Sequence, residues 1–159
     1  MDDHELLAEL VAKEAIRDVI ERYLTAVGAH DWDTVRQCFV PGAYADYGFD
    51  VERTIEAQLE LVQRGIRRFD ASTLLGSNCS VAVRGDAASS DSWALTAHQA
   101  PAESGERTRL SAVRYTDAWV RDREGRWRIT RRTLDTAWRA WLDPRRDDRA
   151  GDHKHADEW

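Results

Sequence analysis

Residues that crosslink chains or hold metal ions are scarce in this sequence. Among its 159 residues there are two cysteines, Cys38 and Cys79, and they do not form a Cys-x-x-Cys spacing. Two distant cysteines are too few for a disulfide framework or for a cysteine-based metal site. We therefore interpret both as reduced core residues and expect no metal.

Motifs that bind cofactors or build a nucleophile are missing as well. The chain has no Gly-x-Ser-x-Gly motif, no glycine-rich phosphate loop and no dinucleotide fingerprint, since Arg84-Gly85-Asp86 supplies a single turn glycine. Nucleophilic and nucleotide-dependent reactions are therefore disfavoured. We expect no cofactor, and proton transfer remains as the chemistry that a few polar side chains can perform.

Long apolar runs are also absent. No stretch of the sequence approaches the roughly 20 apolar residues that a membrane helix needs. The chain begins Met-Asp-Asp-His-Glu, which is acidic, whereas a secretory signal begins with basic residues. These features predict a cytoplasmic protein with no membrane partner.

The sequence has no excess of positive charge. Its formal net charge is -6, which argues against a broad surface for binding phosphates. Arginines give the last third a local basic character: Arg131, Arg132, Arg139, Arg145 and Arg146. We expect no nucleic-acid partner.

Helical patterns occupy the first part of the chain. Apolar residues recur at spacings of three and four over residues 6–27, which is typical of an amphipathic helix, and Gly28 fits its end. Asp31 is placed to cap a second helix over residues 32–39, which Pro41-Gly42 would end. A third helix is predicted over residues 54–69.

Strand patterns dominate the remainder. A short strand is predicted over residues 43–47, and alternating or β-rich patterns then cover residues 73–83, 88–100, 107–120 and 126–141. Helices followed by consecutive strands indicate an α+β domain with helices on one face of a twisted, mostly antiparallel sheet. We predict one domain over residues 1–142 and a polar, flexible tail over residues 143–159.

The order of several short motifs resembles a known family. The motifs are Gly-Ala-His-Asp-Trp-Asp (28–33), Gly-Ser-Asn (76–78), Arg-Tyr-Thr-Asp (114–117) and Gly-Arg-Trp-Arg-Ile (125–129). Together they resemble the SnoaL-like branch of the nuclear transport factor 2-like superfamily. The resemblance implies a cone-shaped α+β barrel, in which three N-terminal helices pack on a curved, mostly antiparallel sheet around a blind apolar pocket. Members of that superfamily include scytalone dehydratase, ketosteroid isomerase, polyketide cyclases, a dehydrochlorinase and noncatalytic binding modules.

The sequence departs from the dehydratase-like members at two positions. Those members place an Asp near the end of the first helix and a His at the start of the strand that follows the third helix. Here the corresponding residues are Gly28 and Leu74. The usual His–Asp pair is absent, so its mechanism does not carry over to this chain.

His98 is the histidine best placed for chemistry. It is the one histidine that falls inside a strand-like apolar run, residues 92–98, and an imidazole can take or give a proton near neutral pH. Asp135, on another predicted strand, would raise the pKa of the imidazole and fix its tautomer if the two groups meet. The alternatives are a structural histidine and an Asp135 that pairs with Arg131 or Arg132.

The predicted pocket takes its other polar groups from tyrosines. Tyr23 faces inward on the first helix, and Tyr47 shares the face of Ala45 on the first strand. A phenol in an apolar pocket can donate a strong hydrogen bond to a carbonyl, an epoxide oxygen or a developing alkoxide. We therefore predict His98, Asp135 and Tyr47 as catalytic residues.

The strand alternation leaves the lining of the pocket open at one point. Trp93 and His98 lie on opposite faces of their strand unless a bulge changes the register, so one of them faces away from the pocket. If Trp93 faces the pocket, Asp91 joins its rim. By the resemblance, Tyr115 and Asp117 look into the cone. The predicted substrate-binding residues are Tyr23, Trp93, Tyr115, Asp117 and Arg132.

These residues predict a cofactor-independent cyclase, isomerase or dehydratase acting on a small, apolar natural-product intermediate. Ring closure by epoxide opening fits best with the lost His–Asp pair. Tyr47 with His98 would then supply the acid, and Asp135 the base. The alternative is a noncatalytic small-ligand-binding or dimerisation module, and the Trp- and Arg-rich outer face of the sheet predicts a homodimer in either case.

Overall fold

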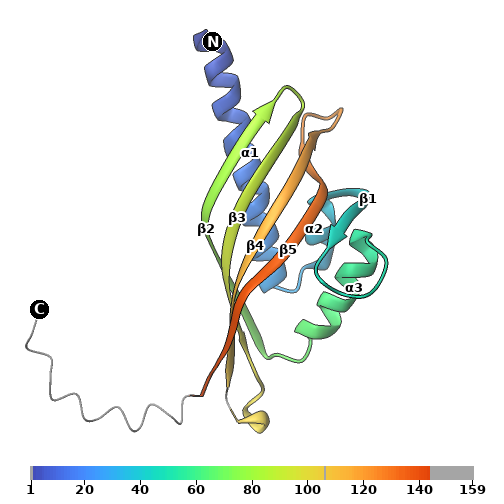
Figure 1. Ribbon diagram of the computed structural model, residues 1–159, viewed down its shortest axis with the longest axis vertical. Helices are drawn as coiled ribbons and strands as arrows, with labels where there is room; N and C mark the ends of the chain where they lie inside the picture. The colour runs from blue at the N-terminus through green and yellow to red at the C-terminus, as the bar shows by residue number, and fades with distance from the viewer. Residues whose placement is uncertain (1, 106, 144–159) are drawn as a thin grey trace, which may run out of the picture.

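The computed structural model describes residues 2–105 and 107–143 of the chain. Its centre is one five-stranded sheet with the strand order β1-β5-β4-β3-β2 (Figure 1). The strands are β1 (Phe39–Asp46), β2 (Ala71–Arg84), β3 (Ala87–Gln99), β4 (Thr108–Arg121) and β5 (Trp127–Leu142). Strands β2 to β5 pair antiparallel in sequence, whereas β1 pairs parallel with β5.

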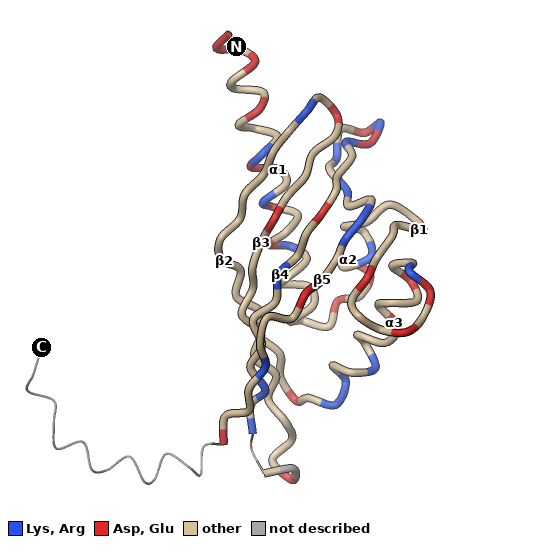
Figure 2. The backbone as a smooth tube through the Cα atoms, in the orientation of Figure 1, with Lys and Arg blue, Asp and Glu red and all other residues tan. Residues whose placement is uncertain are grey.

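The helices cover one face of this sheet. They are α1 (Asp3–Gly28), α2 (Trp32–Gln37) and α3 (Ile55–Ile66), with a short 3-10 turn, η1 (Ala102–Ser104), between β3 and β4. A capping box between Asp2 and Glu5 begins α1, and the side chains of Asp31 and Thr54 cap α2 and α3. Charged residues lie on the helices and in the turns, and also along the strands β3, β4 and β5 (Figure 2).

Helix α1 is buried along only part of its length. The first turns of α1 extend past the sheet (Figure 1), and Leu7 and Val11 are 59% and 60% exposed there. From Ile16 onward one side of the helix is buried against the sheet. Gly76 on β2 permits the close approach of the two elements, because a Cβ there would lie 2.8 Å from Cδ1 of Leu24.

The start of β1 differs from the sequence prediction. Pro41 and Gly42, which were predicted to end a helix, lie inside β1. The pairing with β5 is irregular between Phe39 and Tyr44, and Gly42 there has a φ of +68°. Proline has no amide hydrogen for a ladder, so an edge strand with an irregularity is where it fits.

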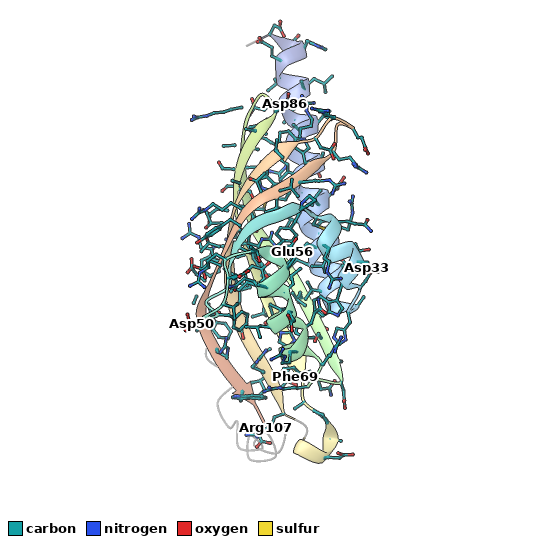
Figure 3. The ribbon with its side chains drawn as sticks, turned by 90° about the vertical axis from the view of Figure 1, so that its right-hand side faces the viewer. Asp33, Asp50, Glu56, Phe69, Asp86 and Arg107 are labelled. Atoms are coloured by element: carbon teal, nitrogen blue, oxygen red, sulfur yellow. The ribbon has the colours of Figure 1, made fainter. Side chains whose placement is uncertain are left out.

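Side chains from the sheet and the helices fill the space between the layers (Figure 3). The predicted α+β class with a curved, mostly antiparallel sheet is confirmed, and the helices and strands lie within a few residues of their predicted bounds. Within the described part of the chain, no helix is long and apolar enough to cross a membrane. The predicted tail lies outside the described residues from residue 144 onward.

Candidate functional site

A pocket of about 410 Å³ lies between α3, the end of α1 and the covered face of the sheet. This volume is within the range of small-molecule sites. Its lining combines apolar side chains with hydroxyl, imidazole and guanidinium groups. The lining residues are Tyr23, Val27, Tyr47, Gly48, Phe49, Leu61, Val62, Gly65, Ile66, Leu74, Thr96, His98, Arg109, Ser111, Val113, Tyr115, Leu134, Thr136 and Arg139.

The alternation of β3 decides which of its side chains reach the pocket. Ser90, Ser92, Ala94, Thr96 and His98 are buried in turn, which places them on the face that the helices cover. No bulge interrupts the pairing of β3 with β4. His98 therefore faces the pocket.

Three tyrosines form the deep end of the pocket. The hydroxyl oxygens of Tyr23 and Tyr47 lie 3.1 Å apart, and the ring of Tyr115 meets that of Tyr23 edge to face at 5.7 Å. Burial raises the pKa of Tyr47 and of Tyr115 well above the ordinary value. These phenols stay protonated at neutral pH and can donate hydrogen bonds to a bound ligand.

A buried ion pair supports the tyrosines. Asp117 accepts two hydrogen bonds of 2.7 Å from Arg132, whose guanidinium carbon lies 4.2 Å from the ring centre of Tyr23 and 4.5 Å from that of Tyr115. Burial alone would lower the pKa of Arg132, but the Asp117 carboxylate outweighs it and raises that pKa. Asp117 and Arg132 were both predicted to bind substrate. In the structure they bind each other beneath the tyrosines.

His98 lies toward the open end of the pocket. Its Nδ1 is 2.8 Å from Oγ of Ser72, and its ring packs against Phe69 at 5.2 Å between centres. Burial lowers its pKa, and together with the charges of Arg109 and Arg139 and with His30 it brings that pKa to about 4. The imidazole is therefore neutral at pH 7.

The predicted pairing of His98 with Asp135 is wrong. Asp135 lies opposite Arg114, and Arg114 belongs to the uncovered face because its neighbours Val113 and Tyr115 are buried on the covered one. Asp135 is accordingly exposed. The side chains of His98 and Asp135 point to opposite sides of the sheet, so Asp135 has no access to the pocket.

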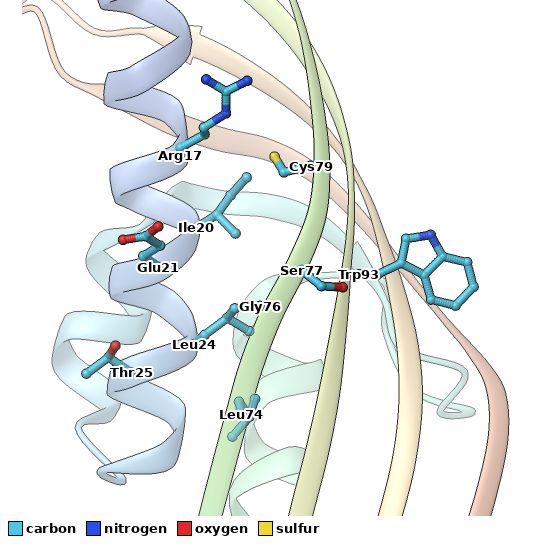
Figure 4. A pocket seen from close by; sticks show the side chains of 10 residues that line it. All are labelled: Arg17, Ile20, Glu21, Leu24, Thr25, Leu74, Gly76, Ser77, Cys79 and Trp93. Atoms are coloured by element: carbon cyan, nitrogen blue, oxygen red, sulfur yellow. The ribbon is translucent and has the colours of Figure 1, made fainter. Parts of the chain in front are cut away.

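The predicted contact of Trp93 with the enclosed space is wrong for the same reason. Trp93 opposes Arg114 and points away from α1 (Figure 4). Asp91, on the same face, forms an ion pair with Arg114 outside the pocket. Because side chains alternate along β3, Trp93 cannot face the pocket when His98 does.

Two pocket residues, Arg109 and Arg139, were not predicted. The signal was present in the alternation of β4, where Arg109 shares the face of Ser111, Val113 and Tyr115. For Arg139 the alternation was misleading, because the register of β5 shifts between the partners of Ala112 and Val113. A bulge of this kind changes which face later residues occupy.

The two positions of the missing His–Asp pair do adjoin in space. A Cβ on Gly28 would lie 3.8 Å from Cδ1 of Leu74 and 3.2 Å from the carbonyl oxygen of Ser72. The correspondence drawn from the sequence is therefore geometrically consistent. Neither side chain can carry a proton.

A second hollow, of about 490 Å³, runs along α1 and β2 (Figure 4). It follows the edge of the sheet and is lined by Arg17, Glu21 and Thr25 on α1 and by Ser77 and Cys79 on β2. It contains none of the predicted catalytic residues. Among the described residues, no three His, Cys, Asp or Glu side chains converge to hold a metal ion.

Comparison with known proteins gives the following matches. Residues 8–133 match the family model of the SnoaL-like domain. A proposed scytalone dehydratase of Novosphingobium aromaticivorans is similar in structure, with a TM-score of 0.71 and 20% identity over 82% of this chain and 87% of that chain. The hexachlorocyclohexane dehydrochlorinase LinA-type3 of Novosphingobium barchaimii LL02 matches with a TM-score of 0.71 and 20% identity over 84% and 91% of the two chains.

A proposed ketosteroid isomerase of Shewanella frigidimarina has a TM-score of 0.59 and 18% identity over 76% of this chain and 94% of that chain. A search of the curated proteins found no match. At these identities the structural matches establish a common fold.

Proposed function

Because the chain belongs to the SnoaL-like domain family, whose fold encloses the pocket described above, we propose that it is a cofactor-independent isomerase or lyase of the cyclase or dehydratase type. Its substrate is a small and largely apolar natural-product intermediate. Acid–base catalysis by the pocket side chains performs the reaction.

One observation carries this proposal: a buried phenol and a neutral imidazole line the same cavity as apolar side chains. Tyr47 is 7% exposed and His98 is 5% exposed, and both contribute to the lining. A purely apolar lining would suffice for binding alone. Buried polar groups that converge on one cavity are instead what proton transfer requires.

The chemistry that fits these groups is ring closure by epoxide opening. The attacking hydroxyl of the substrate forms a new C–O bond while a C–O bond of the epoxide breaks. Tyr47 donates its proton to the leaving epoxide oxygen, and Tyr23 hydrogen-bonds to the resulting phenolate. His98, with Nδ1–H donating to Ser72, accepts the proton of the attacking hydroxyl on Nε2. Proton exchange with water restores both residues. His98 thereby replaces Asp135 as the proposed base.

The second candidate function is a noncatalytic small-ligand-binding module. The residues Gly28 and Leu74 favour it, because they leave the positions of the dehydratase His–Asp pair without an ionisable group. The two candidates differ in turnover and not in ligand binding.

The test is isomerisation of a panel of hydroxy-epoxides. Product and substrate have equal mass, so gas chromatography separates them by retention time before mass detection. We expect the parent protein to convert at least one member, and Tyr47→Phe and His98→Ala each to lower kcat by about 10²-fold or more. Tyr44→Phe is the matched control, since Tyr44 stacks on Arg131 away from the pocket. Saturable binding without any conversion would identify the noncatalytic module.

The predicted homodimer has a suitable surface on the uncovered face of the sheet. Leu75, Leu95, Ala112 and Trp138 form one row across four strands, and Leu75, Leu95 and Trp138 are 60%, 39% and 48% exposed. An exposed apolar row of this kind is typical of an interface. We propose that two copies associate through it. Leu95→Asp should halve the mass found by sedimentation equilibrium, and an unchanged mass would exclude this interface.

A further inference from the structure

The open end of the pocket holds positive charge that no carboxylate of the described residues balances. Arg109 and Arg139 both line it, and in the described part of the chain neither has a carboxylate within salt-bridge distance. Burial lowers the pKa of Arg109, and the neighbouring charge of Arg139 lowers it further. Like charges placed close together repel, and an anion bound between them would relieve that repulsion.

Arg109 also has an unsatisfied donor. Its Nε is buried and has no hydrogen-bond partner, while its guanidinium carbon stacks on Phe69 at 4.6 Å. Stacking fixes the plane of the guanidinium and leaves its donors directed sideways. A buried donor without a partner is costly, which suggests that a ligand completes it.

No described residue that lines the pocket can neutralise the two arginines. Among the described residues that line the pocket there is no Asp or Glu. The polar neighbours of the two arginines on this face are hydroxyl groups of Thr96, Ser111 and Thr136, together with the neutral His98. Hydroxyls can add hydrogen bonds to an anion but cannot balance the charge.

We propose that the ligand of this pocket is an apolar carboxylate whose carboxylate group binds between Arg109 and Arg139 and whose apolar body extends toward Tyr23, Tyr47 and Tyr115. The planar fork of a guanidinium matches a carboxylate geometrically. The inference deepens the proposed function, since it names the substrate class of the same pocket. The proposal concerns ligand binding, so an experiment can contradict it without contradicting the proposed catalysis.

The test compares a carboxylate with its neutral counterpart of the same shape. Binding of 2-naphthoate and 2-naphthamide to the full chain is measured by isothermal titration calorimetry. We expect the acid to bind at least tenfold more tightly than the amide. Arg139→Gln and Arg109→Gln should each weaken binding of the acid by about tenfold and leave the amide unchanged.

Arg131→Gln is the matched control, because it removes the same charge from β5 where the side chain stacks on Tyr44 outside the pocket. It should change neither affinity. Arg139 is exposed, so Arg139→Gln remains informative if Arg109→Gln fails to fold. Equal affinity of acid and amide, or no binding of the acid, would overturn the proposal. Tighter binding of 2-naphthyl phosphate than of the acid would overturn the assignment of a carboxylate.

The titration of His98 supplies a second readout. The groups that face its imidazole are Ser72 on β2, Arg109 on β4, Arg139 on β5, and the rings of His30 and Phe69. A carboxylate between the arginines would offset their charge, so 2-naphthoate should raise the pKa of His98 measured by NMR, whereas 2-naphthamide should not. An unchanged titration with bound acid would place the carboxylate elsewhere and overturn the proposal. Binding of the acid without any turnover would instead count against the proposed catalysis.

Discussion

The two ends of the pocket use arginine in opposite ways. At the deep end Arg132 is fully buried, and Asp117 neutralises it through two hydrogen bonds. At the open end Arg109 and Arg139 have no such partner among the described residues. Arginine at the deep end is therefore part of the folded core, whereas the arginines at the open end are free to bind an anionic ligand. Removing charge should cost stability at the deep end and ligand affinity at the open end.

The largest effect should come from Asp117→Asn. The substitution keeps the shape of the side chain but leaves the charge of Arg132 buried and unpaired, which should lower the free energy of unfolding by about 3–5 kcal/mol. Urea denaturation measures this loss. Asp91→Asn, which breaks the partly exposed pair with Arg114, should cost less than about 1 kcal/mol. Similar losses for the two variants would contradict the distinction between buried and exposed pairs.

Acid should destabilise the protein by protonating His98 at the open end of the pocket. Since the pKa of His98 is about 4 in the folded state and near 6.5 when unfolded, the unfolded chain binds more protons between these values. Stability from this residue is complete above pH 6.5 and is lost as the pH falls toward 4, by roughly 3 kcal/mol. His98→Gln should flatten this part of the curve of the free energy of unfolding against pH. An equally steep curve in the variant would assign the acid sensitivity to other groups.

A smaller effect is expected where the tyrosines meet. Tyr47→Phe removes the hydrogen bond to Tyr23, so the free energy of unfolding should fall by about 1 kcal/mol. Thermal and urea denaturation report the change, and Tyr44→Phe is again the control. If Tyr47→Phe proved more stable than the parent, the hydroxyl would be held in place for function at the expense of the fold.

The smallest effect on stability should be that of Arg139→Gln. Arg139 is exposed, and its removal relieves the repulsion of Arg109, so the free energy of unfolding should stay within about 0.5 kcal/mol of the parent. The same variant should raise the pKa of His98, because one of the charges that lower it is gone. A large loss of stability would show that Arg139 supports the fold and would remove the contrast between the two ends.

The sequence predicted the fold more completely than it predicted the site. Helical and alternating periods separate α1 from the strands, and the same alternation permits His98 to face the pocket. It could not decide between His98 and Trp93, because a shift of one residue exchanges the two faces. The structure resolved that choice through the burial of Ala94, Thr96 and His98.

The pairing of residues across the sheet could not be predicted from the sequence, for a different reason. Asp117 opposes Arg132 only because β5 shifts its register by one residue near Ala118 and Trp119. A second shift near Ala112 and Val113 brings Arg139 to the covered face. Bulges depend on how two strands meet, so one strand's pattern does not reveal them.

Gly28 also constrains how this chain could change over evolution or by engineering. An Asp there would place its Cβ 3.2 Å from the carbonyl oxygen of Ser72 and next to the aliphatic Leu74, which offers the carboxylate no imidazole to pair with. A His at position 74 alone would face a glycine. Neither single substitution restores a working pair, so the dehydratase arrangement is separated from this sequence by two coupled replacements and an unfavourable intermediate. The present pocket is therefore more readily diversified at its open end than returned to the His–Asp mechanism.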